Sequence, residues 1–217
     1  MKRLIIATIV GMMATISFGQ KIALDTELKV KKPKLNGLEI RIGGGSGELD
    51  IKTTGDDSFT EDISKTSSIG LEYFSNTACD KLKLGYGFLI QDHGEYDYDG
   101  VDVEFSSVSV FGSGKFYFNI TNDLKPYIKA NLGVSLNRDD GKLAYYADYT
   151  GYYHSVEIEN GLYSAIGIGF DIKNKFIVEF MFENNSADVK YFINNVKLNY
   201  ESEVMVKRSS IVLGYRF

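Results

Sequence analysis

The chain ends on a segment of alternating character, residues 211–217 (IVLGYRF). Successive side chains of a strand point to opposite faces, so Ile211, Leu213, Tyr215 and Phe217 share one apolar face. Because chain ends are usually solvated and frayed, a terminal apolar ring gains a soluble protein little. The closing strand of a β-barrel in a membrane gains more, since it faces lipid and pairs with the first strand. The segment therefore favours a transmembrane barrel.

The first 19 residues have the order of a secretory signal peptide. Lys2 and Arg3 supply the positive start, an apolar stretch covers 4–16, and a cleavage site is expected before Gln20. The apolar stretch is shorter than the roughly 18 residues that a helical span requires, so a transmembrane helix is the weaker interpretation. We expect three parts: a signal peptide at 1–19, a polar, basic periplasmic lead-in at 20–36, and one barrel domain at 37–217.

The charge balance argues against a nucleic-acid partner. The chain has 24 basic and 29 acidic residues, and loss of Lys2 and Arg3 with the signal leaves 22 basic ones. A net negative chain has no electrostatic drive toward nucleic acid or anionic lipid. The mean hydropathy of −0.13 also fits a membrane barrel, because only alternate strand residues touch lipid. The single cysteine, Cys79, is expected to be a free thiol.

Period-two segments separated by turn-rich ones follow from Leu38 onward, each long enough to cross a bilayer at a tilt. Long polar connections alternate with short ones, which is the hairpin plan of an outer-membrane barrel with long loops outside. The apolar phase of the first segment shifts at Gly43–Gly45, and a bulge at these glycines would reconcile its two halves. The pattern predicts an all-β fold, a single up-and-down antiparallel eight-stranded transmembrane β-barrel. Its strands are expected near 37–51, 66–75, 81–91, 103–118, 126–137, 161–172, 175–184 and 204–217, and its long loops at 52–65, 92–102, 138–160 and 185–203.

The two faces of these strands differ in a way that assigns the lumen. One face carries large apolar side chains, as at Phe176, Val178, Phe180 and Phe182. The other mixes small residues with charges, which suits a lumen just wide enough for its own side chains and would fill a soluble lipocalin-like barrel badly. Buried charges are expensive unless paired, so these groups should pair and plug the lumen. The predicted inward charges are Arg41, Lys83, Lys115, Lys129, Arg208 and Arg216 with Glu39, Glu72, Asp171, Glu179 and Glu183.

At this point the chain resembles the small eight-stranded outer-membrane barrels, the OmpX/Ail type and the transmembrane domain of OmpA. The resemblance covers roughly 37–217 and rests on the signal, the alternating loops and the apolar C-terminal pattern. It implies that Ile211, Leu213, Tyr215 and Phe217 form the signal read by the barrel-assembly machinery. Gly214 directly precedes Tyr215, so the fit to the family pattern is partial. The resemblance further implies export to the bacterial outer membrane, with outer-membrane lipid and lipopolysaccharide as partners.

Candidate catalytic and metal-binding groups are few. His93 and His154 are the two histidines, both placed in outer loops by the strand assignment. His154 is adjacent to Ser155, so on a strand the two side chains would point to opposite faces, where a base cannot reach its nucleophile. The acidic stretch 92–104 lacks the glycine and closing glutamate of a calcium loop. We therefore expect no catalytic residues, metal or cofactor.

The third long loop carries five tyrosines within nine residues: Tyr145, Tyr146, Tyr149, Tyr152 and Tyr153. Tyrosine offers large amphipathic contact area at low entropic cost and is common on binding surfaces. The same rings could instead belong to the aromatic girdle at the membrane interface, and both interpretations stay open. The leading hypothesis is a structural outer-membrane barrel that presents loops for adhesion to, or recognition of, a host or matrix ligand. The alternative is a narrow conduit for small or hydrophobic molecules of the OmpW-like porin kind, and the third is a lipid A-modifying enzyme.

Overall fold

The structure is a computed structural model that describes residues 37–52, 58–98, 101–118, 123–139, 146–147, 153–193 and 196–217. The predicted signal peptide and lead-in, 1–36, lie outside the described residues. Within the described part, no helix is long and apolar enough to cross a membrane.

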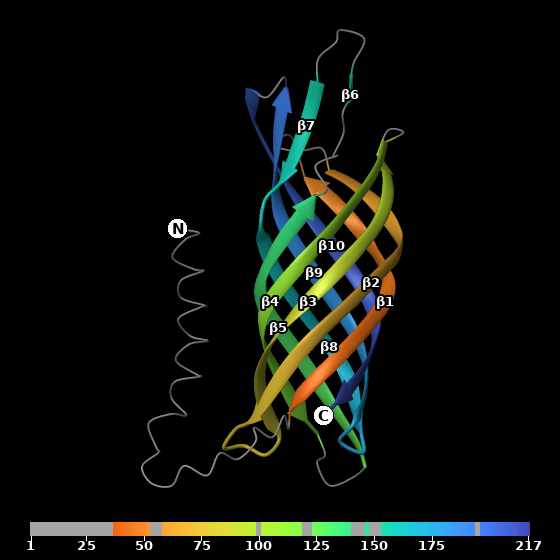
Figure 1. Cartoon of the computed structure of the whole chain (residues 1–217), viewed down its shortest axis with the longest axis vertical. Helices are drawn as coiled ribbons and strands as arrows, with labels where there is room; N and C mark the ends of the chain where they lie inside the picture. The colour runs from red at the N-terminus through yellow and green to blue at the C-terminus, as the bar shows by residue number, and fades with distance from the viewer. Residues whose placement is uncertain are drawn as a thin grey trace, which may run out of the picture. The chain divides into compact units, whose positions relative to one another are not determined.

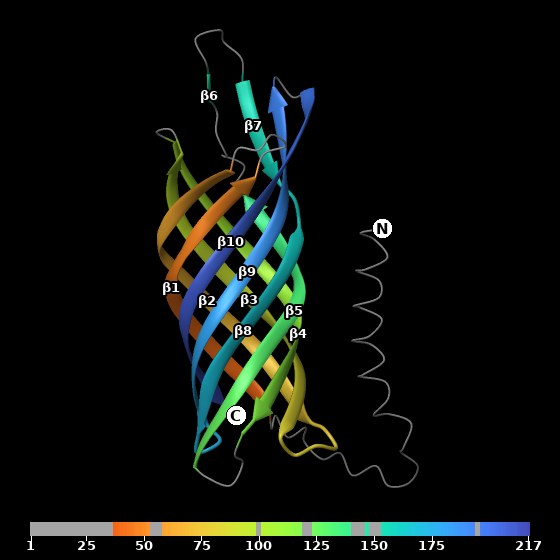
Figure 2. The same ribbon diagram turned by 180° about the vertical axis from the view of Figure 1, so that it is seen from behind.

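Eight long antiparallel strands close into a barrel (Figures 1 and 2). Each strand pairs with its neighbour along the chain, and β10 pairs back onto β1 from Glu39↔Arg216 to Lys52↔Glu203. This confirms the predicted fold. The barrel strands are β1 (Leu38–Lys52), β2 (Ser58–Asn76), β3 (Leu82–Tyr98), β4 (Val101–Tyr117), β5 (Leu124–Asp139), β8 (Gly161–Ile172), β9 (Phe176–Ile193) and β10 (Val196–Arg216).

The strands reach further outward than the sequence pattern predicts. β9 continues to Ile193 and β10 begins at Val196, so most of the expected loop 185–203 is a paired hairpin. Most of the expected loop 92–102 is likewise strand. In the β9 extension the apolar residues change sides, from the outward Phe180 and Phe182 to the inward, buried Ala187. The apolar face that marks the membrane part of the strand therefore ends although the backbone pairing continues. Two short strands, β6 (Tyr146–Ala147) and β7 (Tyr153–Ile158), extend the sheet beside the outer part of β9.

The expected bulge in the first strand is wrong in its position. β1 pairs with β10 without interruption, and its side chains keep alternating past the glycines. The extra residue lies on β2, where the register shifts between the Gly45 and Gly47 pairings. Leu49 therefore points into the lumen, fully buried, and not outward with Ile40 and Ile42. The apolar phase shift in β1 marks a hydrophobic part of the barrel interior.

The strands are staggered around the barrel. Directly opposed residues lead from Ile40 through Leu71, Phe88, Val110, Val134, Leu162, Ser186 and Met205 back to Asp50 on β1, ten positions beyond the start. With about 3.3 Å per residue and about 4.8 Å between strands, this stagger corresponds to a tilt of roughly 40° from the barrel axis. We measure height along the barrel axis, increasing from the end where the C-terminus lies. Moving one residue along a strand changes the height by about 2.5 Å, and moving from a residue to its opposed partner on the next strand changes it by about 3 Å.

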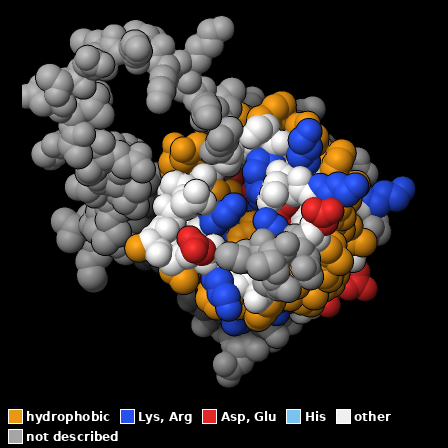
Figure 3. All heavy atoms as spheres, turned by 90° about the horizontal axis from the view of Figure 1, so that it is seen from below, with side chains coloured by type: hydrophobic (Ala, Val, Ile, Leu, Met, Phe, Trp, Pro, Cys, Tyr) orange, Lys and Arg blue, Asp and Glu red, His pale blue; other side chains and the backbone are white. Residues whose placement is uncertain are grey.

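The side chains divide by type between the two sides of the wall. Large apolar residues lie outside, among them Leu132 (68% exposed), Ile166 (63%) and Ile211 (60%). Seen along the barrel from the end where the C-terminus lies, hydrophobic side chains surround a centre in which charged groups gather (Figure 3). This confirms the predicted sidedness, with an apolar exterior and an ionic interior.

Candidate functional site

The carboxylate of Glu39 on β1 lies in the barrel interior and is fully buried. It accepts hydrogen bonds from Arg41 (2.9 Å), Lys115 on β4 (2.7 Å) and Arg216 on β10 (2.7 and 3.0 Å). Alternation along the strands places all four groups on the inward face. One carboxylate thus joins three strands across the lumen.

Two further glutamates continue this network. Glu72 on β2 accepts from Lys129 on β5 at 2.6 Å and from Arg41 at 3.3 Å. Glu179 on β9 pairs with Arg41, lies 3.5 Å from the Lys129 ammonium, and accepts a hydrogen bond from the Tyr127 hydroxyl at 2.5 Å. A buried charge is tolerated where opposite charges and hydrogen bonds compensate its lost hydration.

Asp171 on β8 completes the set. It pairs with Arg216 at 2.5 Å and accepts a hydrogen bond from the Tyr117 hydroxyl at 3.3 Å. The predicted pairing of the inward charges is confirmed for these groups. We call them the ionic layer: Glu39, Arg41, Glu72, Lys115, Lys129, Asp171, Glu179 and Arg216.

A hydrophobic layer lies next to the ionic layer and was not predicted. Its members are inward-facing and buried, with the Phe111 and Tyr163 rings 5.1 Å apart. Inward glycines make room for such rings, since a Cβ added at Gly169 would lie 2.6 Å from Cζ of Tyr127. Inward glycines on the strands next to an inward aromatic residue are thus the sequence feature that could have predicted aromatic rings in the interior. The hydrophobic layer consists of Leu89, Phe111, Tyr163, Ala165, Met181 and Val212.

Beyond the hydrophobic layer the interior becomes polar again. Glu183 accepts hydrogen bonds of 2.5 Å from both Gln91 and Ser210, and its carboxylate lies 3.8 Å from the Arg208 guanidinium. Gln91 in turn accepts from Asn185 at 3.0 Å. We call this set, which joins β3, β9 and β10, the polar layer.

His93 belongs to this outer part of the interior, and its expected position in a loop is wrong. It lies on β3, is fully buried, and places Nε2 2.7 Å from Oγ of Ser107 on β4. The sequence signal was present, because His93 keeps the inward phase of Lys83 and Gln91. Although the contact joins a base to a hydroxyl, both side chains have no exposed area, so in this conformation no substrate could reach them.

The C-terminal residues Ile211, Leu213, Tyr215 and Phe217 all face outward, each between 38% and 60% exposed. The Phe217 amide donates a hydrogen bond to the Leu38 carbonyl at 3.1 Å, and its ring lies 5.2 Å from that of Tyr215. The predicted assembly signal is therefore an apolar row beside the seam between β10 and β1. Its reading by an assembly machinery stays a prediction.

The five predicted tyrosines are only partly described. Tyr145, Tyr149 and Tyr152 lie outside the described residues, whereas the backbones of Tyr146 and Tyr153 belong to β6 and β7. The backbones of His154 and Ser155 lie on β7, opposite Ile193 and Phe192 of β9. In the part of the chain that is described, no three metal-ligating side chains come together. Cys79 is exposed in the short turn after β2.

No protein-family model and no curated protein matches the chain. Similar solved structures include the outer membrane protein OprG from Pseudomonas aeruginosa, with 16% identity, 84% of this chain and 97% of that chain covered, and a TM-score of 0.48. The outer membrane protein AlkL in lipid bilayers has 15% identity, coverage of 89% and 97%, and a TM-score of 0.47. Ail, the attachment invasion locus protein of Yersinia pestis, has 17% identity, coverage of 84% and 99%, and a TM-score of 0.39.

The assignment of the fold rests on the chain's own geometry. Eight staggered antiparallel strands close on themselves, apolar side chains cover the outside, and paired charges fill the inside. In lipid a closed barrel satisfies every backbone hydrogen bond and leaves no free edge. The chain is thus a small closed β-barrel whose apolar exterior and ionic interior fit a membrane-spanning barrel.

Proposed function

We propose that this protein is a closed, non-catalytic scaffold of the outer membrane that presents its outer hairpins for adhesion or recognition. The observation that carries the proposal is the filled interior. Along β9 the inward positions run from Glu179 in the ionic layer through Met181 to Glu183 in the polar layer. Along β10 they run from Arg216 through Val212 to Arg208. The ionic, hydrophobic and polar layers therefore lie one after another across any path along the barrel axis.

The closure is consistent with the number of strands. An eight-stranded barrel is just wide enough for its own side chains, in contrast to the aqueous channels of 16- to 18-stranded porins. Ionic groups that are each paired in several directions have little freedom to swing aside, because an unpaired buried charge is costly. A conduit along the barrel axis is therefore disfavoured.

The outer ends supply the surface for recognition. β9 extends eleven residues beyond Phe182, an exposed residue of the outer apolar face, to Ile193, which is a height of roughly 27 Å at this tilt. Side chains stabilise the base of the projection, where Lys190 pairs with Glu159 and the Asn137 amide donates to the Glu159 carbonyl at 2.8 Å. The predicted tyrosine loop connects β5 to β7 in this region and remains the proposed contact surface.

Planar-bilayer recording tests the closure. The refolded protein should show no stable openings, whereas removal of side chains in all three layers (Lys115→Ala, Glu179→Ala, Phe111→Ala and Glu183→Ala together) should create openings if the variant still forms a barrel. The mobility of unheated against heated samples on a gel reports the closed barrel. Regular openings of the unaltered protein would contradict the proposal and favour the conduit.

Cell attachment tests the presentation of loops. Deletion of 143–155 should reduce binding of bacteria to host cells and to immobilised matrix proteins, with the barrel still heat-modifiable. Replacement of the five tyrosines by serine in a full-length loop should have the same effect, because it removes ring area and keeps loop length. Undiminished attachment in both variants would remove the recognition role. Lipid A from cells with and without the protein should give the same mass spectrum, since an altered spectrum would indicate an enzyme.

A further inference from the structure

The apolar belt around the outside of the barrel differs in height from strand to strand. On β5 every outward position from Leu124 to Leu136 is apolar. At about 2.5 Å per residue this strip is roughly 30 Å high, which matches the hydrocarbon core of a bilayer. The wall around β5 therefore fits an unperturbed membrane. The outward residues of the strip are Leu124, Pro126, Ile128, Ala130, Leu132, Val134 and Leu136.

On the opposite wall the belt is much shorter. Outward apolar residues on β1 run from Leu38 to Ile42 and are followed by Gly44, Ser46 and Glu48. The apolar strip there is about 10 Å high. On β2 it ends at Ile69, followed by Ser67 and Lys65, and on β10 at Ile211, followed by Ser209 and Lys207. The strips on these strands are about 10 Å and about 15 Å high.

A tilt of the whole barrel cannot remove this difference. Relative to Ile40, the strip on β5 runs from roughly 13 Å below to roughly 17 Å above, and that on β1 from roughly 5 Å below to roughly 5 Å above. The strip on β1 thus ends inside the range of β5 at both edges. Tilting a cylinder raises both edges on one side and lowers both on the other, so it cannot serve both walls. Most of the deficit lies at the outer edge.

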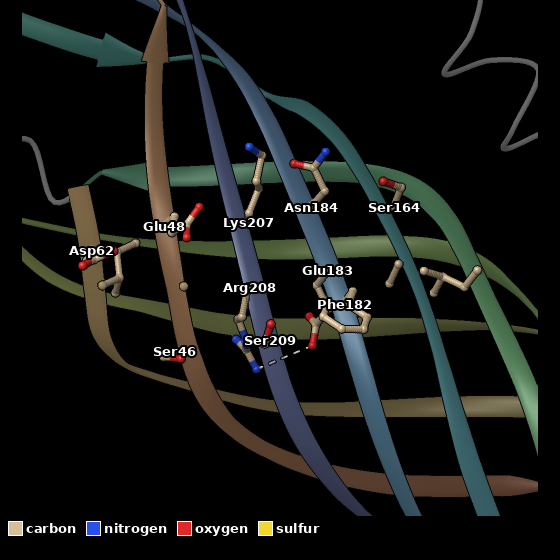
Figure 4. A pocket seen from close by; sticks show the side chains of 14 residues that line it. Ser46, Glu48, Asp62, Ser164, Phe182, Glu183, Asn184, Lys207, Arg208 and Ser209 are labelled. Atoms are coloured by element: carbon tan, nitrogen blue, oxygen red, sulfur yellow. Dashed lines mark ion pairs between the residues drawn. The ribbon is translucent and has the colours of Figure 1, made fainter. Parts of the chain in front are cut away.

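A hollow of about 830 Å³ runs from the short wall at β1 and β10 across β9 to Ser164 and Ile166 on β8 (Figure 4). Its outward lining mixes small polar side chains such as Ser46, Ser164 and Ser209 with charged ones, and Phe182 lies at its inner side. Asn184 also lines it, and the Lys207 ammonium above it is paired with Asp50 at 2.5 Å. Hydroxyl, amide and carboxylate groups facing hydrocarbon without partners would cost several kcal/mol in total.

We propose that this hollow holds the headgroups and water of the outer lipid leaflet, so that the bilayer is locally thinned beside β10, β1 and β2. Lipid adapts to a short hydrophobic surface by thinning at a modest cost per ångström, and that cost is spread over mobile acyl chains. Headgroups supply hydrogen bonds to the serines and to Asn184 that acyl chains cannot. The partner of this wall is thus the polar part of the lipid, while the β5 wall contacts acyl chains at the same height.

Nitroxide labels at matched heights test this inference. In a Cys79→Ser background, single cysteines replace Ser209 on β10 and Val134 on β5, which both lie roughly 12 Å above Ile40 by the strand ladder. The protein is refolded into dioleoylphosphatidylcholine vesicles. Collision of the label with a polar nickel chelate, relative to collision with oxygen, should be several-fold more frequent for Ser209→Cys than for Val134→Cys. Ser46→Cys gives a second label on the short wall, should Ser209→Cys fail to form a heat-modifiable barrel.

Two outcomes would overturn the proposal. Equal and low chelate contact at both walls would show that acyl chains fill the hollow. Low chelate contact together with spin–spin broadening at Ser209→Cys, lost when labelled protein is diluted with unlabelled protein, would show that a second copy covers it. A third label at Leu132, which is 68% exposed on the tall wall, should be inaccessible to the chelate in every case.

Discussion

The ammonium of Lys115 lies 2.7 Å from the carboxylate of Glu39, across the lumen from β4 to β1. Neither side chain has any exposed area. Because Glu39 also binds Arg41 and Arg216, its negative charge compensates several cations that cannot reach water. The stability of the barrel should therefore depend strongly on this carboxylate.

Glu39→Gln should destabilise the barrel by roughly 3–5 kcal/mol, the usual effect of removing one partner from a buried ion pair. Urea unfolding in vesicles, followed by the gel mobility of unheated samples, measures the change. Glu48→Gln on the same strand is the matched control, since Glu48 is exposed, and it should be close to neutral. The double variant Glu39→Gln with Lys115→Met should cost less than the sum of the single changes, because it removes a cation together with its partner. Strict additivity would show that the two groups do not interact.

Gly169→Ala should destabilise the barrel by about 1–3 kcal/mol, as overpacking of a filled interior does. The added methyl group would lie 2.6 Å from Cζ of Tyr127, a buried ring hydrogen-bonded to Glu179. Gly112→Ala is the control: it faces outward, and its nearest neighbour would be 3.9 Å away. If both variants unfold at the same urea concentration, the interior is not tightly packed at Gly169.

The ion pair between Asp50 and Lys207 should give a pH-dependent stability outside the apolar belt. A hydrogen bond from Lys207 lowers the pKa of Asp50, helped by one from the Thr60 hydroxyl at 2.9 Å. A lowered carboxyl pKa means that the contribution is complete above the ordinary aspartate value and is lost as the pH falls below about 4. The urea midpoint of Asp50→Asn should therefore lie below that of the unaltered protein at pH 7 and converge with it at acid pH. A difference that is constant with pH would assign the effect to something other than this carboxylate.

Phe217→Ala should reduce the amount of folded barrel in cells while changing refolding into detergent little. The Phe217 ring packs against Tyr215 on the lipid side of the seam, so its loss affects recognition of the strand more than the interior. Heat-modifiable protein in the outer-membrane fraction measures assembly. Phe118→Ala is the control, because Phe118 is equally exposed, 54% against 53%, and directly follows β4, away from the seam. An equal loss for both variants would contradict a special role of the C-terminal residue.

The fold follows from the sequence wherever one face of a strand is apolar. Ile128, Leu132 and Leu136 alternate with Lys129, Gly133 and Ser135, which specifies both the strand and its sidedness. The outward face of β9 becomes polar after Phe182, at Asn184, Ser186 and Asp188, so the sequence pattern predicts a loop where the strand in fact continues to Ile193. Only the pairing of the backbone with β10 reveals it.

The sequence predicts which charged residues face the lumen, but it does not predict which of them pair with one another. The inward parity of Glu39, Lys115 and Arg216 identifies them as lumen residues, and charge balance implies that they pair. Which carboxylate takes which cation depends on the stagger of the strands, because opposed positions on different strands differ in height. The sequence contains no direct signal for that stagger. The position of Leu49 was missed for a related reason, since the extra residue lies on β2.

The pairing of β10 with β1 has a consequence for biogenesis. β1 pairs with β2 on one side and with β10, the last strand of the barrel, on the other, so its second edge stays open until β10 has paired with it. The ion pair between Glu39 and Arg216 joins these two strands, so it forms only when the barrel has closed. A chain that ends before β10 would therefore keep an unpaired strand edge at β1, and such an edge invites pairing with other chains.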